Sequence, residues 1–177
     1  MANWFCTDNR LGVLNLGNVD NVNVDNTTTN NRYPIGTVVR GTDSTLGGGE
    51  FIYLQGGTSV AIGTIVSYNA TTGAVTAVPN TGNLGVPVAI SLAANTTATN
   101  YSWYQIGGLA TVLKLVGTPV LPQAKVYISS TAGTVAPTSA SGKQVLGAKF
   151  ANLTTLTSAA TTGTVMIDRP SMQSQIT

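Results

Sequence analysis

The amino-acid sequence predicts an all-β protein, a compact β-barrel or β-sandwich of about ten short strands with an extended N-terminal arm. Three observations lead to this prediction. The 177 residues are rich in glycine, threonine, asparagine and valine, and only 8% of them are charged. Apolar and polar residues alternate with period 2 in several short runs, and turn residues separate these runs. No stretch of about 12 residues carries the apolar stripe of a helix, which repeats every 3.6 residues.

Residues 1–32 are predicted to form the arm. Within it, residues 18–31 are a polar, low-complexity run with too few large side chains to build a core. The apolar residues of the arm have to bury against this domain or against a neighbouring subunit, so we expect them to make subunit or partner contacts. These contact residues are Trp4, Phe5, Leu14, Leu16, Val19, Val22 and Val24.

Residues 33–170 are predicted to form the β domain, and residues 171–177 a short C-terminal tail. In the run 86–92, every second residue is a large aliphatic one, which predicts a strand with one buried face. Pro87 lacks an N–H group, so it belongs at a strand start, an edge or a bulge. The predicted strands are 37–40, 50–55, 64–68, 74–78, 86–92, 101–106, 109–115, 125–129, 144–151 and 164–168.

Glycine-containing turns are predicted between these strands, among them 46–49 and 106–108. A faint internal repeat also occurs at an offset of 60 residues. It predicts a hairpin unit that is used twice, either through duplication or because both copies share common turn chemistry. The aligned positions are Val66, Tyr68, Gly73, Val75 and Gly82 with Val126, Ile128, Gly133, Val135 and Gly142.

Little in the chain can carry out catalysis. It contains no histidine and one cysteine, which excludes Ser-His-Asp triads, Cys-His pairs and the usual zinc sites that contain histidine. Most of the six acidic residues lie in polar loop or arm sequence, where nothing predicts a raised pKa. Asn21, Asn23 and Asp25 alternate as calcium ligands do, but the loop glycine and the distal glutamate are missing. We therefore predict no enzyme activity, no metal site and no cofactor.

The charges and the hydropathy exclude two further classes of partner. Eight basic and six acidic residues leave a net charge of +2, and the basic residues are scattered along the sequence, so no nucleic-acid partner is expected. No window approaches about 18 consecutive apolar residues, so no membrane span is expected. The first residues lack the pattern of a secretory signal, which predicts a protein made in a cytoplasm.

The densest aromatic cluster is Tyr101-Ser-Trp-Tyr-Gln. Its side chains are expected to pack in the core or at a subunit interface. Alternatively, Trp103 and Tyr104 form a surface aromatic patch that contacts a sugar.

Several stretches, in order over residues 33–170, resemble small virion structural proteins of tailed bacteriophages, and above all capsid decoration (cement) proteins. The stretches are YPIGTVVR at 33–40, GEFIYLQG at 49–56, GTIVSY at 63–68, VPVAI at 86–90, YSWYQIGG at 101–108 and VMIDRP at 165–170.

This resemblance implies a β domain on the outer surface of the virion that binds the major capsid protein and stabilises the shell, often as a trimer and without catalysis or cofactor. The resemblance does not cover residues 1–32; from their composition we expect this arm to bind the capsid or a sister protomer. The alternative is a receptor- or glycan-binding module of a head fibre or tail, which would use Trp103, Tyr104 and the loop 91–100.

Overall fold

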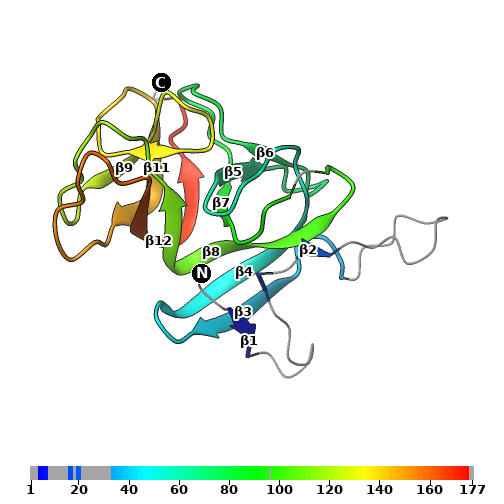
Figure 1. Cartoon of the computed structure of the whole chain (residues 1–177). Helices are drawn as coiled ribbons and strands as arrows, with labels where there is room; N and C mark the ends of the chain where they lie inside the picture. Colours follow the sequence, from blue (N-terminus) through cyan, green and yellow to red (C-terminus); the bar gives the residue numbers. More distant parts are fainter. Residues whose placement is uncertain (1–3, 8–15, 18, 21–32, 96, 176–177) are drawn as a thin grey trace.

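The computed structural model describes residues 4–7, 16–17, 19–20, 33–95 and 97–175. These residues form twelve β-strands and no helix, which confirms the all-β prediction (Figure 1). The strands are β1 (Phe5–Cys6), β2 (Val19–Asp20), β3 (Val38–Asp43), β4 (Gly47–Gln55), β5 (Ile65–Tyr68), β6 (Val75–Ala77), β7 (Val88–Ser91), β8 (Tyr101–Leu113), β9 (Lys125–Ile128), β10 (Val135–Ala136), β11 (Gln144–Phe150) and β12 (Thr162–Met172).

Strand β8 organises the fold, because it pairs with β2, β4, β7 and β12. The antiparallel ladder runs in the order β1-β3-β4-β8-β12-β11-β9-β10. It then returns to the end of β8, where Val135 forms a parallel bridge with Lys114 and the Leu115 N–H donates to the Val135 carbonyl at 2.9 Å. Strands β8, β12, β11, β9 and β10 thus close a small barrel. Strand β7 pairs with β8 beside it, β5 pairs with β7, and β6 pairs with β5 (Figure 1).

The two predicted hairpin units have the same geometry. Tyr68 pairs with Val75 in the β5–β6 hairpin, and Ile128 pairs with Val135 in the β9–β10 hairpin, which is the same register 60 residues later. Gly73 and Gly133, at equivalent turn positions, have φ angles of 69° and 72°, a region that glycine adopts without strain. The two units therefore share their register and turn geometry as well as the spacing of their residues.

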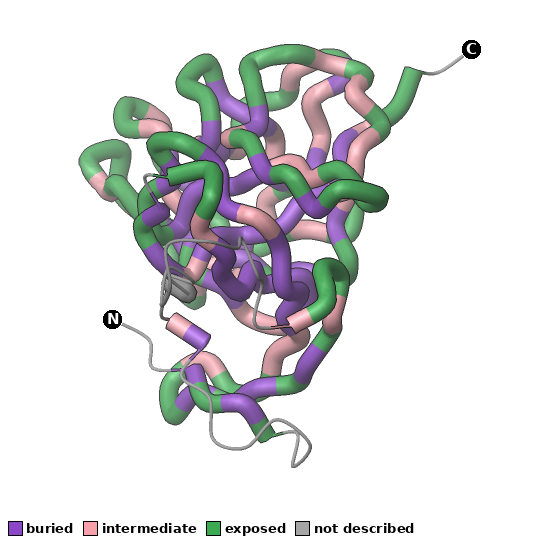
Figure 2. Tube along the Cα trace, turned by 90° about the vertical axis from the view of Figure 1, so that its right-hand side faces the viewer, coloured by how far each residue is buried: buried purple, intermediate pink, exposed green. Residues whose placement is uncertain are grey.

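Three hydrophobic clusters fill the interior. Figure 2 shows the buried residues along the chain in purple. The largest occupies the barrel and includes Val112, Val145 and Phe150. A second, which includes Ile52 and Tyr104, draws on β4, β5, β6, β7 and β8. The third is the aromatic cluster, defined here as Trp4, Cys6, Leu16, Val39, Phe51, Tyr53, Tyr101 and Trp103. The neighbours Tyr53 and Ile52 belong to different clusters, so β4 is buried on both faces.

The structure corrects two predicted turns. The glycines at 107 and 108 do not end a strand, because β8 runs through them from Tyr101 to Leu113. Gly47, Gly48 and Gly49 likewise belong to β4, and the turn lies just before them. There the Asp43 carboxylate accepts hydrogen bonds from the N–H groups of Thr45 and Leu46, both at 2.8 Å. Gly49 and Gly108 mark a close approach of backbones, because an added Cβ would lie 3.0 Å from the Gly107 carbonyl oxygen and 2.4 Å from the Gly48 carbonyl oxygen, respectively.

Candidate interaction surface

Two of the predicted contact residues are core residues of this same chain. Trp4 is 1% exposed and packs edge-on against Phe51, with ring centroids 4.9 Å apart. Leu16 is also buried, and its N–H donates to the Trp4 carbonyl at 3.0 Å. The expectation that these side chains contact a partner was therefore wrong. The physical reason is that one face of β4 and β8 is aromatic, and the chain covers that face with its own N-terminal residues.

The other predicted contact residues are placed differently. Phe5 lies in β1, which pairs with β3, and its side chain is 46% exposed. Val19 belongs to β2, whose backbone pairs with β8 opposite Ser102. Leu14, Val22 and Val24 lie outside the described residues. Phe5 is thus an exposed apolar side chain, held by its strand on the domain.

Trp103 and Tyr104 are not at the surface. Trp103 is 3% exposed and packs against Tyr53 at a centroid distance of 5.1 Å, while Tyr104 is 0% exposed. Successive residues of a strand point to opposite faces, and both faces of β8 are covered at this point. The surface aromatic patch is therefore corrected to core packing.

The burial of Tyr104 has a consequence at alkaline pH. Desolvation by burial raises the pKa of Tyr104 above its usual 10.0, and the side chains of Ser102 and Asn95 act in the opposite direction to a smaller extent. The folded protein thus holds the phenol proton more tightly than the unfolded chain. The contribution of this phenol to the free energy of unfolding is fully present below pH 10.0. It is lost as the pH rises through the raised pKa.

We therefore expect the free energy of unfolding to fall between about pH 10 and about pH 12, and to fall less in Tyr104→Phe. Denaturant titrations of both proteins across this range measure the effect. An unchanged pH dependence in Tyr104→Phe would contradict the prediction.

A row of charged side chains crosses four strands on the outer face of the sheet. Arg40 of β3 pairs with Glu50 of β4, Glu50 pairs with Gly107 of β8, and Gly107 pairs with Asp168 of β12. Directly paired residues point to the same face of a sheet. The side chains of Arg40, Glu50 and Asp168 therefore lie side by side, and Gly107 leaves a gap among them.

A second row lies next to the first. Lys125 of β9 pairs with Lys149 of β11, and Lys149 pairs with Met166 of β12. Met166 is two residues before Asp168 on the same strand and so points to the same face. We call this surface the charged face and define it by Arg40, Glu50, Lys125, Lys149, Met166, Asp168 and Arg169. Four of these residues are basic and two are acidic, which leaves a surplus of two positive charges.

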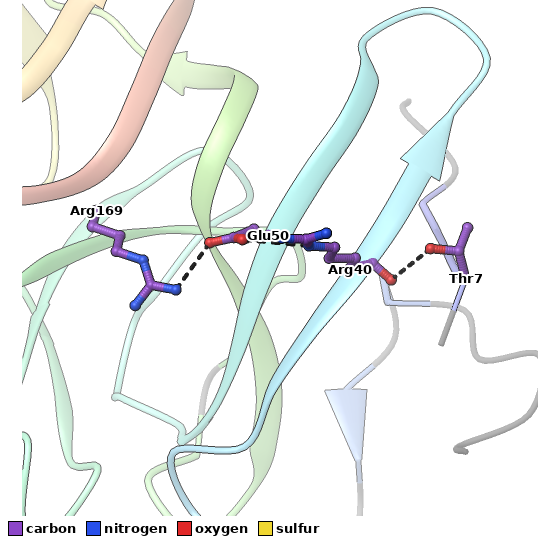
Figure 3. Close-up of polar contacts among 4 residues, drawn as sticks. All are labelled: Thr7, Arg40, Glu50 and Arg169. Atoms are coloured by element: carbon purple, nitrogen blue, oxygen red, sulfur yellow. Dashed lines mark hydrogen bonds and ion pairs between the residues drawn. The ribbon is translucent and has the colours of Figure 1, made fainter. Parts of the chain in front are cut away.

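A bulge in β12 supplies Arg169. Leu146 pairs with Ser171 and Ala148 with Ile167, so Gly147 alone stands opposite residues 168–170. Arg169 has a φ angle of 40°, a region that costs energy for any residue except glycine. This conformation places its guanidinium nitrogen 3.2 Å from Glu50 Oε2 (Figure 3). Bulges re-aim side chains in this way, often at functional sites.

Glu50 is shared by two arginines. Its other carboxylate oxygen is 3.5 Å from Arg40 Nε, and the carbonyl of Arg40 accepts a hydrogen bond from the Thr7 hydroxyl at 3.3 Å (Figure 3). The arginine side chains are 80% and 66% exposed, and ion pairs at such positions add little to stability. The strained backbone at Arg169 therefore adds little stability through this ion pair. It instead fixes the positions of Arg40, Glu50 and Arg169 on an exposed surface.

Glycines form the floor of this surface. An open hollow of about 680 Å³ lies over Gly48, Gly49, Gly107 and Gly108 and is bordered by Arg40, Glu50, Asp168 and Arg169. A smaller hollow beside it, of about 360 Å³, is lined by Lys149, Met166 and Asp168. Sequence reasoning missed the charged face because its residues are far apart in the chain. The local signal in the sequence was that most of the charged residues lie among outward positions of predicted strands, and Met166, which is apolar, carries no such signal.

The described residues hold no group of three or more cysteine, aspartate or glutamate side chains that could bind a metal ion. Asn21, Asn23 and Asp25, which alternate like calcium ligands, lie outside the described residues. Among the described residues there is also no helix long and apolar enough to cross a membrane. The charged face could therefore bind a partner through its ion-paired arginines, its glycine backbone and the exposed lysines Lys125 and Lys149.

No protein-family model matches this chain, and no curated protein matches it either.

Proposed function

We propose that this protein is a bacteriophage head decoration (cement) protein that binds the outer surface of the shell formed by the major capsid protein and stabilises it. Two lines of argument support the proposal. One is the resemblance to capsid decoration proteins over residues 33–170. The other is structural support from the charged face. There, strands that are far apart in the sequence bring Arg40, Glu50 and Asp168 to one exposed surface.

The charged face is the proposed contact with the capsid. Its surplus of positive charge fits an acidic surface on the partner, because complementary potentials speed association and fix the orientation of docking. Gly48 is exposed and Gly49 and Gly108 are half-buried, so a partner can approach the backbone closely there. Phe5 pairs with Thr42 and Thr42 with Gly48, so this exposed aromatic ring lies at one end of the same face. A buried aromatic side chain commonly dominates the energy of such interfaces.

Avidity would add to these contacts. A trimer that engages three equivalent sites raises the effective concentration of each contact, so that moderate affinities suffice for stable attachment. The proposed attachment therefore does not require high affinity at any single contact.

Charge reversal on the face tests the proposal. We expect the double variant Lys125→Glu with Lys149→Glu to bind heads of its virus about tenfold more weakly at low salt than the unchanged chain, because it turns attraction into repulsion. Co-sedimentation of purified chain with purified heads measures binding. Lys143→Glu is the matched control, because Lys143 contacts Asn80 and lines none of the hollows described above.

Two results would contradict the proposal at different levels. If virions contain no copies of this chain on their outer surface, the decoration function is wrong. If the double variant binds heads as tightly as Lys143→Glu does, the chain decorates the capsid through another surface.

A further inference from the structure

Exposed apolar side chains gather on two loops at one end of the barrel. The loops are residues 114–124, between β8 and β9, and residues 151–161, between β11 and β12 (Figure 1). They carry the three most exposed large apolar side chains in the described part of the chain: Val116 is 55% exposed, Leu121 66% and Leu153 96%. We call these three residues the loop patch. Exposed apolar side chains that lie together usually mark a contact with another molecule.

Backbone hydrogen bonds hold the two loops side by side. The N–H of Gly117 donates to the Ser158 carbonyl at 2.8 Å, and Val120 and Leu156 exchange hydrogen bonds at 3.0 and 2.9 Å. The amide nitrogen of Asn152 also donates to the Val120 carbonyl, at 3.2 Å. Each residue of the loop patch is the sequence neighbour of one of these bonded residues. The three apolar side chains therefore project from one hydrogen-bonded stretch of chain.

A buried lysine adds a further link between the loops. Lys114 is 3% exposed, and its ammonium group donates to the carbonyls of Leu115 at 2.9 Å and Ala160 at 3.2 Å, one on each loop. Burial of an ammonium group is unfavourable unless hydrogen bonds compensate for the lost hydration. Here those hydrogen bonds join the two loops. The loop patch is thus held in place before a partner binds, which lowers the entropy cost of binding.

The chemistry of the loops indicates the partner. Their only charged residue is the buried Lys114, so a charged partner would lose its hydration here without gaining a counter-charge. The loops contain no aromatic residue and no exposed basic residue, whereas membrane-surface contacts usually use both. What surrounds the loop patch is a set of exposed hydroxyl groups, each of which can donate and accept a hydrogen bond: Thr154, Thr155, Thr157 and Ser158.

An uncharged apolar surface with such hydroxyl groups around it is complementary to a copy of itself, as contacts about a symmetry axis require. Two charged faces are not, because each has a surplus of positive charge. We infer that the loop patch is the surface through which copies of this chain associate, with the same patch of each copy meeting at a symmetry axis. The inference does not depend on the proposed capsid function, because the loop patch shares no residue with the charged face.

Sedimentation velocity of the full chain at a series of concentrations tests this inference. We expect the unchanged chain to associate as its concentration rises. The double variant Leu121→Asp with Leu153→Asp should associate at least about thirtyfold more weakly, because the contact would bury carboxylates without a counter-charge. Both leucines are exposed, so the unfolding midpoint measured by circular dichroism should stay the same. Leu146→Asp is the matched control, because Leu146 is 43% exposed on β11, outside the two loops.

Three results would overturn the inference. The first is an unchanged chain that stays monomeric at every concentration. The second is a double variant that associates as tightly as Leu146→Asp does. The third is binding of the unchanged chain to phosphatidylcholine vesicles that the double variant loses, which would assign the loop patch to a membrane surface. Head binding is measured separately, so this inference and the proposed function can fail independently.

Discussion

Replacing Trp4 with alanine is expected to lower the free energy of unfolding by about 3 to 5 kcal/mol. The indole is fully buried against Phe51 in the aromatic cluster, and its removal leaves a cavity between the N-terminal segment and the sheet. The cost combines the lost burial of a large apolar surface with the lost packing contacts. Chemical denaturation monitored by circular dichroism measures the change.

The adjacent residue provides the control. Phe5→Ala removes an aromatic side chain that is 46% exposed, so it should cost less than about 1 kcal/mol. If the N-terminal residues formed an arm independent of the domain, both variants would be as stable as the unchanged chain. Deletion of residues 1–32, the predicted arm, should likewise destabilise the domain, because Trp4 and Leu16 are part of the core.

Gly108→Ala should destabilise the protein by about 4 kcal/mol or more, or prevent folding. Gly108 has a φ angle of 92°, and a Cβ atom there would lie 2.4 Å from the Gly48 carbonyl oxygen and 3.0 Å from the Gly49 Cα. Both clashes are with backbone, which cannot move without separating β8 from β4. The same displacement would disturb the row from Arg40 to Asp168.

Gly117→Ala separates the two causes. Gly117 has a φ angle of 95° but nothing within 4 Å of an added Cβ, so it carries only the backbone penalty of about 1 to 2 kcal/mol. The difference between the two variants measures the close approach of β4 and β8. Equal unfolding free energies for Gly108→Ala and Gly117→Ala would contradict this account.

Much of the secondary structure could be predicted from the sequence. The run 144–151 became β11 (Gln144–Phe150), and the run 125–129 became β9 (Lys125–Ile128). The equivalent hairpins at an offset of 60 residues also formed, with the same register. These features depend on alternation and turn residues within a few positions of each other, so local sequence is sufficient to predict them.

The errors arose where a residue's role depends on distant partners. Gly107 and Gly108 are typical turn residues, but they are strand residues because β4 approaches them closely. The predicted domain end at residue 170 falls inside β12, which continues to the buried Met172. Trp103 and Tyr104 could be assigned to core or surface only after both faces of β8 were known to be covered.

By itself, the sequence determined the all-β class, most strand positions and the poverty of reactive side chains, because these follow from composition and short-range periodicity. Only the tertiary structure decided that the N-terminal residues complete the aromatic cluster and that Arg40, Glu50, Lys149 and Asp168 share one face. Register between strands far apart in the chain depends on how whole faces pack, and a one-residue shift would turn every side chain of a strand to the other face.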